Sequence, residues 1–160
     1  MGWCLRDQEV ERKGKMKFYV LDTSVVIKWF SEYDEADLDK AIALRNEILD
    51  GNCSITVPDL LFYELANALR YNPQFTAKDV KHALDSMIDF GFEVRGIDGA
   101  ILGRTIEIAF KFNVTVYDAY FLALSQMENK LFLTADYKVA ERLRGFRNII
   151  RLSESRVRET

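Results

Sequence analysis

Short apolar runs alternate with longer amphipathic stretches along almost the whole chain, and this alternation constrains the fold more than any other feature. Strand-like apolar runs occupy residues 18–21, 54–57, 92–97, 131–134 and 149–152. The stretches between them place apolar residues at helical spacing, over 24–30, 34–50, 60–71, 76–91, 99–112, 117–128 and 137–143. Alternating strands and helices form a largely parallel sheet covered by helices. We therefore predict an α/β fold with a mostly parallel central sheet of about five strands.

The 160 residues contain no linker, repeat or low-complexity segment, so we expect one domain over residues 16–152. We expect residues 1–15 to be a poorly ordered or misannotated extension, and residues 153–160 to be a polar tail. No apolar run approaches the roughly 20 residues that span a bilayer, and the N-terminus lacks the apolar segment of a secretory signal. The two cysteines do not suggest a disulfide framework, so we expect a reduced, cytoplasmic protein.

The charge balance is mildly acidic, with 22 Lys and Arg against 25 Asp and Glu and a net charge of −3. A general nucleic-acid binder needs a basic footprint, so any positive charge that contacts nucleic acid must be local. Alternatively, the acids are concentrated for a purpose such as metal binding. The single histidine, His82, lies on the outer side of its predicted helix and leaves little room for histidine chemistry, while Cys53 is expected to be a buried small hydrophobe.

Two carboxylates directly follow predicted strands. Asp22 follows the run that ends at Leu21, and Asp136 follows the run 131–134 after one residue. Functional groups in open α/β sheets gather beyond the carboxyl ends of strands. Each aspartate is equally well placed to cap the helix that follows it, so both interpretations remain open.

Two further carboxylates lie on the inward faces of predicted helices. Asp118 shares a face with Phe121, Leu122 and Ser125. Glu64 lies mid-helix, within an apolar stripe formed by Leu60, Leu61, Leu65, Ala68 and Leu69. Glutamate is rarely buried unless it is paired or coordinated. The alternatives are therefore a buried ion pair, with Arg70 or Lys28 as the partner, or a functional site.

Four carboxylates brought together would repel one another unless a cation neutralised them. Oxygen ligands of this kind favour Mg²⁺ or Mn²⁺. Such an ion lowers the pKa of a bound water and stabilises charge on phosphate oxygens. The set therefore favours phosphodiester hydrolysis.

The segments Val20–Trp29, Val57–Leu69, Tyr117–Ala119 and Leu133–Asp136 together resemble those of PIN-domain nucleases, and more narrowly those of VapC-type toxins of toxin–antitoxin pairs. The resemblance covers residues 17–152. It implies a PIN-like three-layer fold and a Mg²⁺- or Mn²⁺-dependent endoribonuclease.

The family's acidic quartet maps onto Asp22, Glu64, Asp118 and Asp136, which the resemblance implies are the catalytic and metal-binding residues. The residues placed to support them are Thr23, Ser24, Asn67 and Thr134. Asn67, one turn after Glu64, would orient that carboxylate.

Substrate contacts require positive charge around the acids. We expect them from Lys28, Arg70 and Lys138, and residues 137–160 carry seven basic against three acidic residues. That excess has a second interpretation, a solvated helix face and a frayed tail. Trp29, Tyr63 and Tyr117 either stack on unpaired bases or belong to the core.

The resemblance also implies partners: a homodimer, an RNA substrate, and a small VapB-like antitoxin that places an arginine in the acidic pocket. We expect the antitoxin to dock around Trp29, Phe30 and the second helix. The alternative function is a catalytically inactive or regulatory PIN-like binding module. An Asp-nucleophile phosphohydrolase is disfavoured, because that motif needs a second aspartate where this chain has Ser24.

Overall fold

The computed structural model describes residues 15–30 and 35–157, which form a five-stranded parallel sheet flanked by helices. The strands are β1 (Lys17–Leu21), β2 (Cys53–Pro58), β3 (Glu93–Arg95), β4 (Leu131–Thr134) and β5 (Ile149–Arg151). They pair in the order β3-β2-β1-β4-β5, and every pairing is parallel. The α/β fold predicted from the alternation of runs is therefore confirmed.

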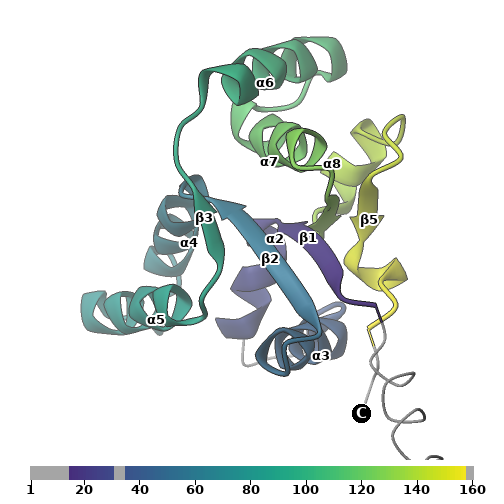
Figure 1. The fold of residues 1–160 in the computed structure, drawn as a ribbon. Helices are drawn as coiled ribbons and strands as arrows, with labels where there is room; N and C mark the ends of the chain where they lie inside the picture. Colours follow the sequence, from purple (N-terminus) through teal and green to yellow (C-terminus); the bar gives the residue numbers. More distant parts are fainter. Residues whose placement is uncertain (1–14, 31–34, 158–160) are drawn as a thin grey trace, which may run out of the picture.

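Helices cover both faces of this sheet. The α-helices are α2 (Thr23–Val26), α3 (Leu38–Leu49), α4 (Leu60–Arg70), α5 (Ala77–Asp89), α6 (Gly99–Phe112), α7 (Val116–Met127) and α8 (Tyr137–Arg142), and the 3₁₀ helices are η1 (Ile27–Phe30) and η2 (Leu152–Glu154). Figure 1 shows α3, α4 and α5 on one side of the sheet and α6, α7 and α8 on the other. The arrangement is a three-layer sandwich.

The core lies where the central strands meet the helices. β1 ends in three buried residues, Tyr19 to Leu21, and β4 in three more, Phe132 to Thr134. Helix α7 buries every residue from Ala119 to Ser125, because it packs across the sheet on one side and against α6 on the other. A helix that is apolar all round is typical of such a fully buried position. Asp118 therefore lies in the first turn of a helix that packs against the sheet.

The largest boundary differences have local causes. The helix predicted from residue 34 begins at Leu38, because its N-cap Asp37 takes a left-handed conformation (φ 61°) that interrupts helical geometry. The strand predicted over 92–97 is reduced to Glu93–Arg95 at the sheet edge. Thr76 caps α5 in a capping box with Asp79, near the start of the helix predicted over 76–91.

The segment after β5 packs against the body of the domain. Ser155 is buried, Val157 contacts the core, and Lys17 Nζ donates to the carbonyl of Arg156 (2.7 Å). The domain end predicted at residue 152 thus falls within a packed segment. The predicted extension 1–15 lies, except for Lys15, outside the described residues, as do 158–160. Within the described ranges, no helix is both long and apolar enough to cross a membrane.

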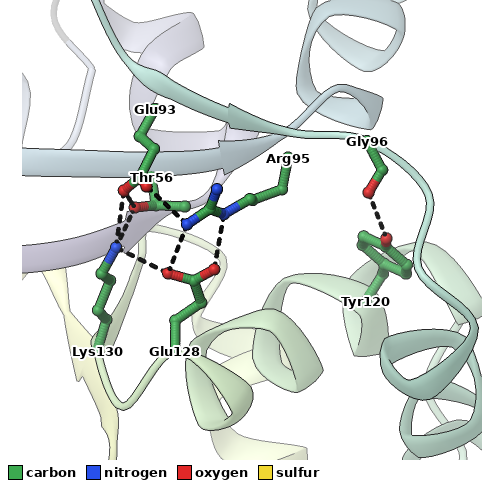
Figure 2. Close-up of polar contacts among 7 residues, drawn as sticks. All are labelled: Thr56, Glu93, Arg95, Gly96, Tyr120, Glu128 and Lys130. Carbon is green, nitrogen blue, oxygen red and sulfur yellow. Dashed lines mark hydrogen bonds and ion pairs between the residues drawn. The ribbon is translucent and has the colours of Figure 1, made fainter.

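A closed ring of charges joins the sheet edge to the end of α7 (Figure 2). Arg95 pairs with Glu93 (2.6 Å) and with Glu128 (2.7 Å), and Lys130 pairs with the same two glutamates at 3.0 Å each. Lys130 Nζ also donates to Thr56 Oγ1 (2.5 Å) on β2. Each carboxylate in this ring is neutralised by cations of the chain itself, and the ring ties the three-residue strand β3 to the rest of the domain.

Candidate active site

The strand order creates a switch point between β1 and β4. From its carboxyl end, β1 leads through α2 and α3 to β2 on one side, whereas β4 leads through α8 to β5 on the other side. The two connections therefore diverge at this point, and open α/β sheets bind ligands beyond the carboxyl ends of the strands at such a switch point. Asp22 follows β1 and Asp136 lies two residues after β4, so both aspartates flank this point.

Asp22 is held by hydroxyl groups and does not cap the following helix. It stands at the N-cap position of α2, but its side chain makes no capping hydrogen bond. Instead Oδ2 accepts from Thr134 Oγ1 (2.6 Å) and from Ser24 Oγ (2.7 Å). The side chain is buried, at 8% relative exposure. Of the two interpretations open for Asp22, the structure excludes capping.

The two hydroxyls also connect the segments on either side of the switch point. Ser24 Oγ lies 3.3 Å from Thr134 Oγ1 and accepts from the backbone N–H of Ala135 (2.9 Å). Thr134 Oγ1 accepts from the N–H of Asp136 (3.0 Å). The turn after β1 and the turn after β4 are thus locked together through Asp22, and Thr134 is fully buried.

Glu64 finds a hydroxyl partner, not a cation. Thr23 Oγ1 donates to Glu64 Oε2 at 2.6 Å, which joins α4 to the start of α2. Within residues 15–30 and 35–157, no lysine, arginine or histidine lies within ion-pair distance of Glu64. Of the two alternatives for Glu64, the described residues therefore exclude the ion pair with Arg70 or Lys28.

The other two carboxylates lie in the first turn or at the cap of their helices. Thr115 caps α7, and its hydroxyl donates to Asp118 Oδ2 (2.7 Å) while accepting from the Asp118 N–H (3.1 Å). Asp136 caps α8, with Oδ1 accepting from the N–H groups of Lys138 and Val139 at 3.1 Å each. The capping interpretation of Asp136 is thus confirmed, and Oδ2 of that carboxylate makes no capping bond.

The four carboxylates act on one another electrostatically. Burial raises the pKa of Asp22 to about 6, because hydrogen bonds from Thr134 and Ser24 only partly oppose it and the charges of Asp118 and Asp136 add to it. Burial also raises the pKa of Glu64, where Thr23 opposes it and Asp22 and Asp118 reinforce it. The pKa of Asp118 is raised by burial and by Asp136, against the hydrogen bond from Thr115 and the charge of Arg142.

The contrast with the charge ring of Figure 2 is informative. The ring's glutamates are neutralised by Lys130 and Arg95, whereas none of the four site carboxylates has an ion-pair partner among the described residues. Clustered carboxylates that have no lysine or arginine partner are suited to bind a divalent metal ion from solution. Their oxygens fit Mg²⁺ or Mn²⁺ by chemistry, but among the described residues no three such side chains already stand in a metal-holding arrangement.

Some of the residues predicted to support the carboxylates or to bind substrate contact the carboxylates, and others do not. Thr23, Ser24 and Thr134 contact the carboxylates directly, as given above. Asn67 is on the exposed side of α4, and no hydrogen bond joins it to Glu64 within the described ranges. Lys28 is buried and pairs with Glu35 Oε1 (3.0 Å), also donating to the carbonyl of Ala36 (2.9 Å).

The remaining predicted contacts are solvent-exposed. Arg70 lies over the ring of Tyr71 (5.4 Å), and Lys138 occupies the first turn of α8 next to Asp136. Tyr63 and Tyr117 are exposed, whereas Trp29 packs inside, stacked on Phe90 (5.3 Å). Trp29 Nε1 also donates to the carbonyl of Ala41 (2.8 Å), so the core interpretation of Trp29 is confirmed. The predictions for His82 and Cys53 are also confirmed, since His82 is exposed and Cys53 is buried with a free thiol.

Sequence reasoning missed two residues that bear on the site. Thr115 holds Asp118, and its position three residues before an acidic residue is the pattern of a helix cap, which would have identified it. Arg142 acts on Asp118 although the two are far apart in sequence. No local signal distinguishes Arg142 from its neighbouring arginines.

A five-stranded parallel sheet with a cluster of carboxylates at its switch point defines an open α/β protein. The chain belongs to the PIN domain family, whose family model matches residues 19–144. No curated protein sequence matches the chain.

Solved structures share the fold. The structure of PAE2754 from Pyrobaculum aerophilum superposes with a TM-score of 0.63 at 15% identity, covering 87% of this chain and 85% of that one. A toxin–antitoxin complex from Klebsiella pneumoniae gives 0.59 at 15% identity, with 87% and 99% covered. VapBC2 from Rickettsia felis, bound to a DNA fragment from its promoter, gives 0.62 at 15% identity, with 84% and 96% covered. At these identities the likeness establishes the fold.

Proposed function

We propose that this protein is a metal-dependent endoribonuclease that hydrolyses RNA phosphodiester bonds. One observation carries the proposal: four carboxylates from separate segments surround the β1–β4 switch point, and none of them has an ion-pair partner among the described residues. Burial and the charges of neighbouring site carboxylates raise the pKa values of Asp22, Glu64 and Asp118. Membership of the PIN domain family, whose members are generally nucleases, supports it.

The proposed cofactor is Mg²⁺ or Mn²⁺, held by Asp22, Glu64, Asp118 and Asp136. One carboxylate oxygen of Asp22 and one of Glu64 accept hydrogen bonds from hydroxyl groups, and one oxygen of Asp136 accepts from the backbone N–H groups that it caps. The other oxygen of each carboxylate is left for an ion or its waters. When bound, the ion would supply an activated water and stabilise charge on the phosphate. Thr134, Ser24 and Thr23 orient the carboxylates, and Asn67 is proposed to steady Glu64 from the exposed side of α4.

The biological role we propose is that of the toxin in a VapBC-type pair. Several structural neighbours are toxin–antitoxin complexes, which supports a small VapB-like antitoxin as the partner. We infer a homodimer that acts in the cytoplasm, where its RNA substrate is found. Co-expression with the genes that flank its own should yield a complex with a small protein that does not cut RNA, and the absence of such a complex, or a complex that still cuts RNA, would count against this role.

The decisive experiment is cleavage of total RNA with end mapping. With Mg²⁺ or Mn²⁺ the wild-type protein should produce fragments with 5′-phosphate and 3′-hydroxyl ends, and EDTA should stop cleavage. Asp22→Asn should abolish cleavage while keeping the fold, whereas Asp85→Asn, which removes an exposed carboxylate on α5, should cut like the parent. If Asp22→Asn cuts as well as the parent, the site assignment is wrong. If the wild type binds RNA with either metal but never cuts it, the inactive binding module is the better description.

A further inference from the structure

Four arginines lie in the segment from α8 to β5, namely Arg142, Arg144, Arg147 and Arg151, and Arg142 is set apart by a hydrogen bond toward the turn that precedes α7. Arg144 donates to Glu141 Oε1 (2.8 Å) and Arg151 to Glu141 Oε2 (3.1 Å). Arg142 instead donates through Nη1 to the backbone carbonyl of Asn113 (2.8 Å). Among the described residues no carboxylate pairs with Arg142, so its positive charge is uncompensated on an exposed side chain.

The bond to Asn113 fixes where this charge lies. Asn113 ends α6 in a left-handed conformation (φ 53°) and starts the short turn to Thr115, the cap of α7. Arg142 therefore reaches from the last turn of α8 to the turn that precedes α7, and the first helical turn of α7 carries Asp118. The electrostatics agree, because the pKa of Asp118, which burial raises and Thr115 lowers, is also lowered by the charge of Arg142.

Two neighbours make this side of the site suitable for a polyanion. Lys138 is exposed one helical turn before Arg142, at the spacing that places both on one face of α8. Tyr117 is 60% exposed and directly precedes Asp118. Carboxylates alone would repel RNA, so a cation beside them favours its approach.

We propose that Arg142 binds a backbone phosphate of single-stranded RNA on the Asp118 side of the site, with Tyr117 offering its ring to an adjacent base. This inference rests on the proposed function. A guanidinium has five N–H donors, and the tether to Asn113 uses one of them, which leaves an edge for a phosphate. Single-stranded RNA exposes both its phosphates and the faces of its bases, as this pairing requires.

The test measures RNA binding without cleavage. In an Asp22→Asn background with Mg²⁺, fluorescence anisotropy with a fluorescein-labelled single-stranded RNA of about 12 nucleotides gives the affinity over a range of salt concentrations. Arg142→Gln should weaken binding about 5- to 10-fold and reduce the slope of log K against log salt by about 0.7, the value for one phosphate contact on a single strand. Arg142→Lys, which keeps the charge, should retain the slope. Arg144→Gln is the matched control, and should change neither quantity because Glu141 already compensates Arg144.

The outcomes separate this proposal from the proposed function. An unchanged slope and affinity for Arg142→Gln, with only a loss of thermal stability, would show that Arg142 merely braces the α6–α7 turn and would overturn the proposal. An equal loss in Arg144→Gln would overturn it as well, since the effect would then be general charge. Absence of cleavage by the wild type would refute the nuclease function, whereas the binding slopes decide the role of Arg142 in either case. If the Asp22→Asn protein binds no RNA, the proposal also fails.

Discussion

Asp22→Asn should stabilise the metal-free protein at neutral pH, although it removes the proposed catalytic centre. The pKa of Asp22 rises from 3.8 to about 6, and each pKa unit corresponds to about 1.4 kcal/mol. The ionised carboxylate therefore reduces the free energy of unfolding by about 3 kcal/mol. Asparagine avoids this charge at little structural cost, because both hydroxyl donors fall on one oxygen, Oδ2, which an amide oxygen can replace.

The sign of the pH dependence follows from the direction of the shift. Because the folded protein binds the proton of Asp22 more tightly than the unfolded chain does, this contribution to stability is complete below about pH 4 and is lost as the pH rises through about 6. The advantage of Asp22→Asn over the parent should thus grow with pH. About half of the 3 kcal/mol should be present at pH 5 and nearly all of it at pH 8.

Urea denaturation in EDTA between pH 4 and pH 8 measures this difference, since the other ionisable groups are common to both proteins and cancel to first order. Asp85→Asn controls for the loss of one exposed negative charge and should show no such trend. Added Mg²⁺ should stabilise the parent but not Asp22→Asn, because a ligand stabilises only the state that binds it. A pH-independent difference, or a variant less stable than the parent at pH 8, would refute the claim that burial of the ionised Asp22 destabilises the metal-free protein.

Three further predictions concern the contacts that shape the fold around the site. Lys130→Met should lower the free energy of unfolding by about 1–3 kcal/mol, because it leaves two glutamates of the ring without one of their cations; urea denaturation tests this, and an effect no larger than that of the exposed Lys81→Met would contradict it. Thr134→Val should cost about 1–3 kcal/mol, since the N–H of Asp136 loses its acceptor, and Thr134→Ser should restore most of it in the same assay. Thr76→Ala should cost about 1 kcal/mol through loss of the α5 capping box, seen as a lower melting temperature that Thr76→Asn largely recovers; equal melting temperatures for the alanine variant and the parent would show that the cap is dispensable.

Much of the fold could be predicted from the sequence because its signals are local. Buried parallel strands appear as apolar runs, and their helices appear as stripes at a spacing of 3.6 residues, so each predicted strand and helix has a counterpart within residues 17–30 and 35–151. The boundaries that failed depended on single backbone conformations, such as the left-handed Asp37. The packed course of residues 153–157 had no local signal either, since it depends on distant partners such as Lys17.

The positions of the four carboxylates were also visible in the sequence, because acids at strand ends and within apolar stripes violate local rules. Their partners were not visible. In the sequence Asp22 and Asp136 are equally well placed to cap a helix. In the structure Asp136 caps its helix, whereas Asp22 accepts hydrogen bonds from Ser24 and from Thr134, which lies more than a hundred residues away in the chain. The sequence predicted Lys28 as a substrate contact, whereas in the structure Lys28 is buried and forms an ion pair with Glu35.

The sequence by itself therefore determined the α/β architecture, the family resemblance and which acids stand in unusual places. Only the tertiary structure decided which carboxylates form ion pairs with lysine or arginine side chains of the described chain, as in the ring around Lys130, and which do not, as in the case of Asp22. The physical reason is that secondary structure follows from neighbouring residues, whereas the charge state and partners of a carboxylate depend on burial and on groups that approach from elsewhere in the chain. The same distinction applies to Arg142, whose role depends on a carbonyl 29 residues away.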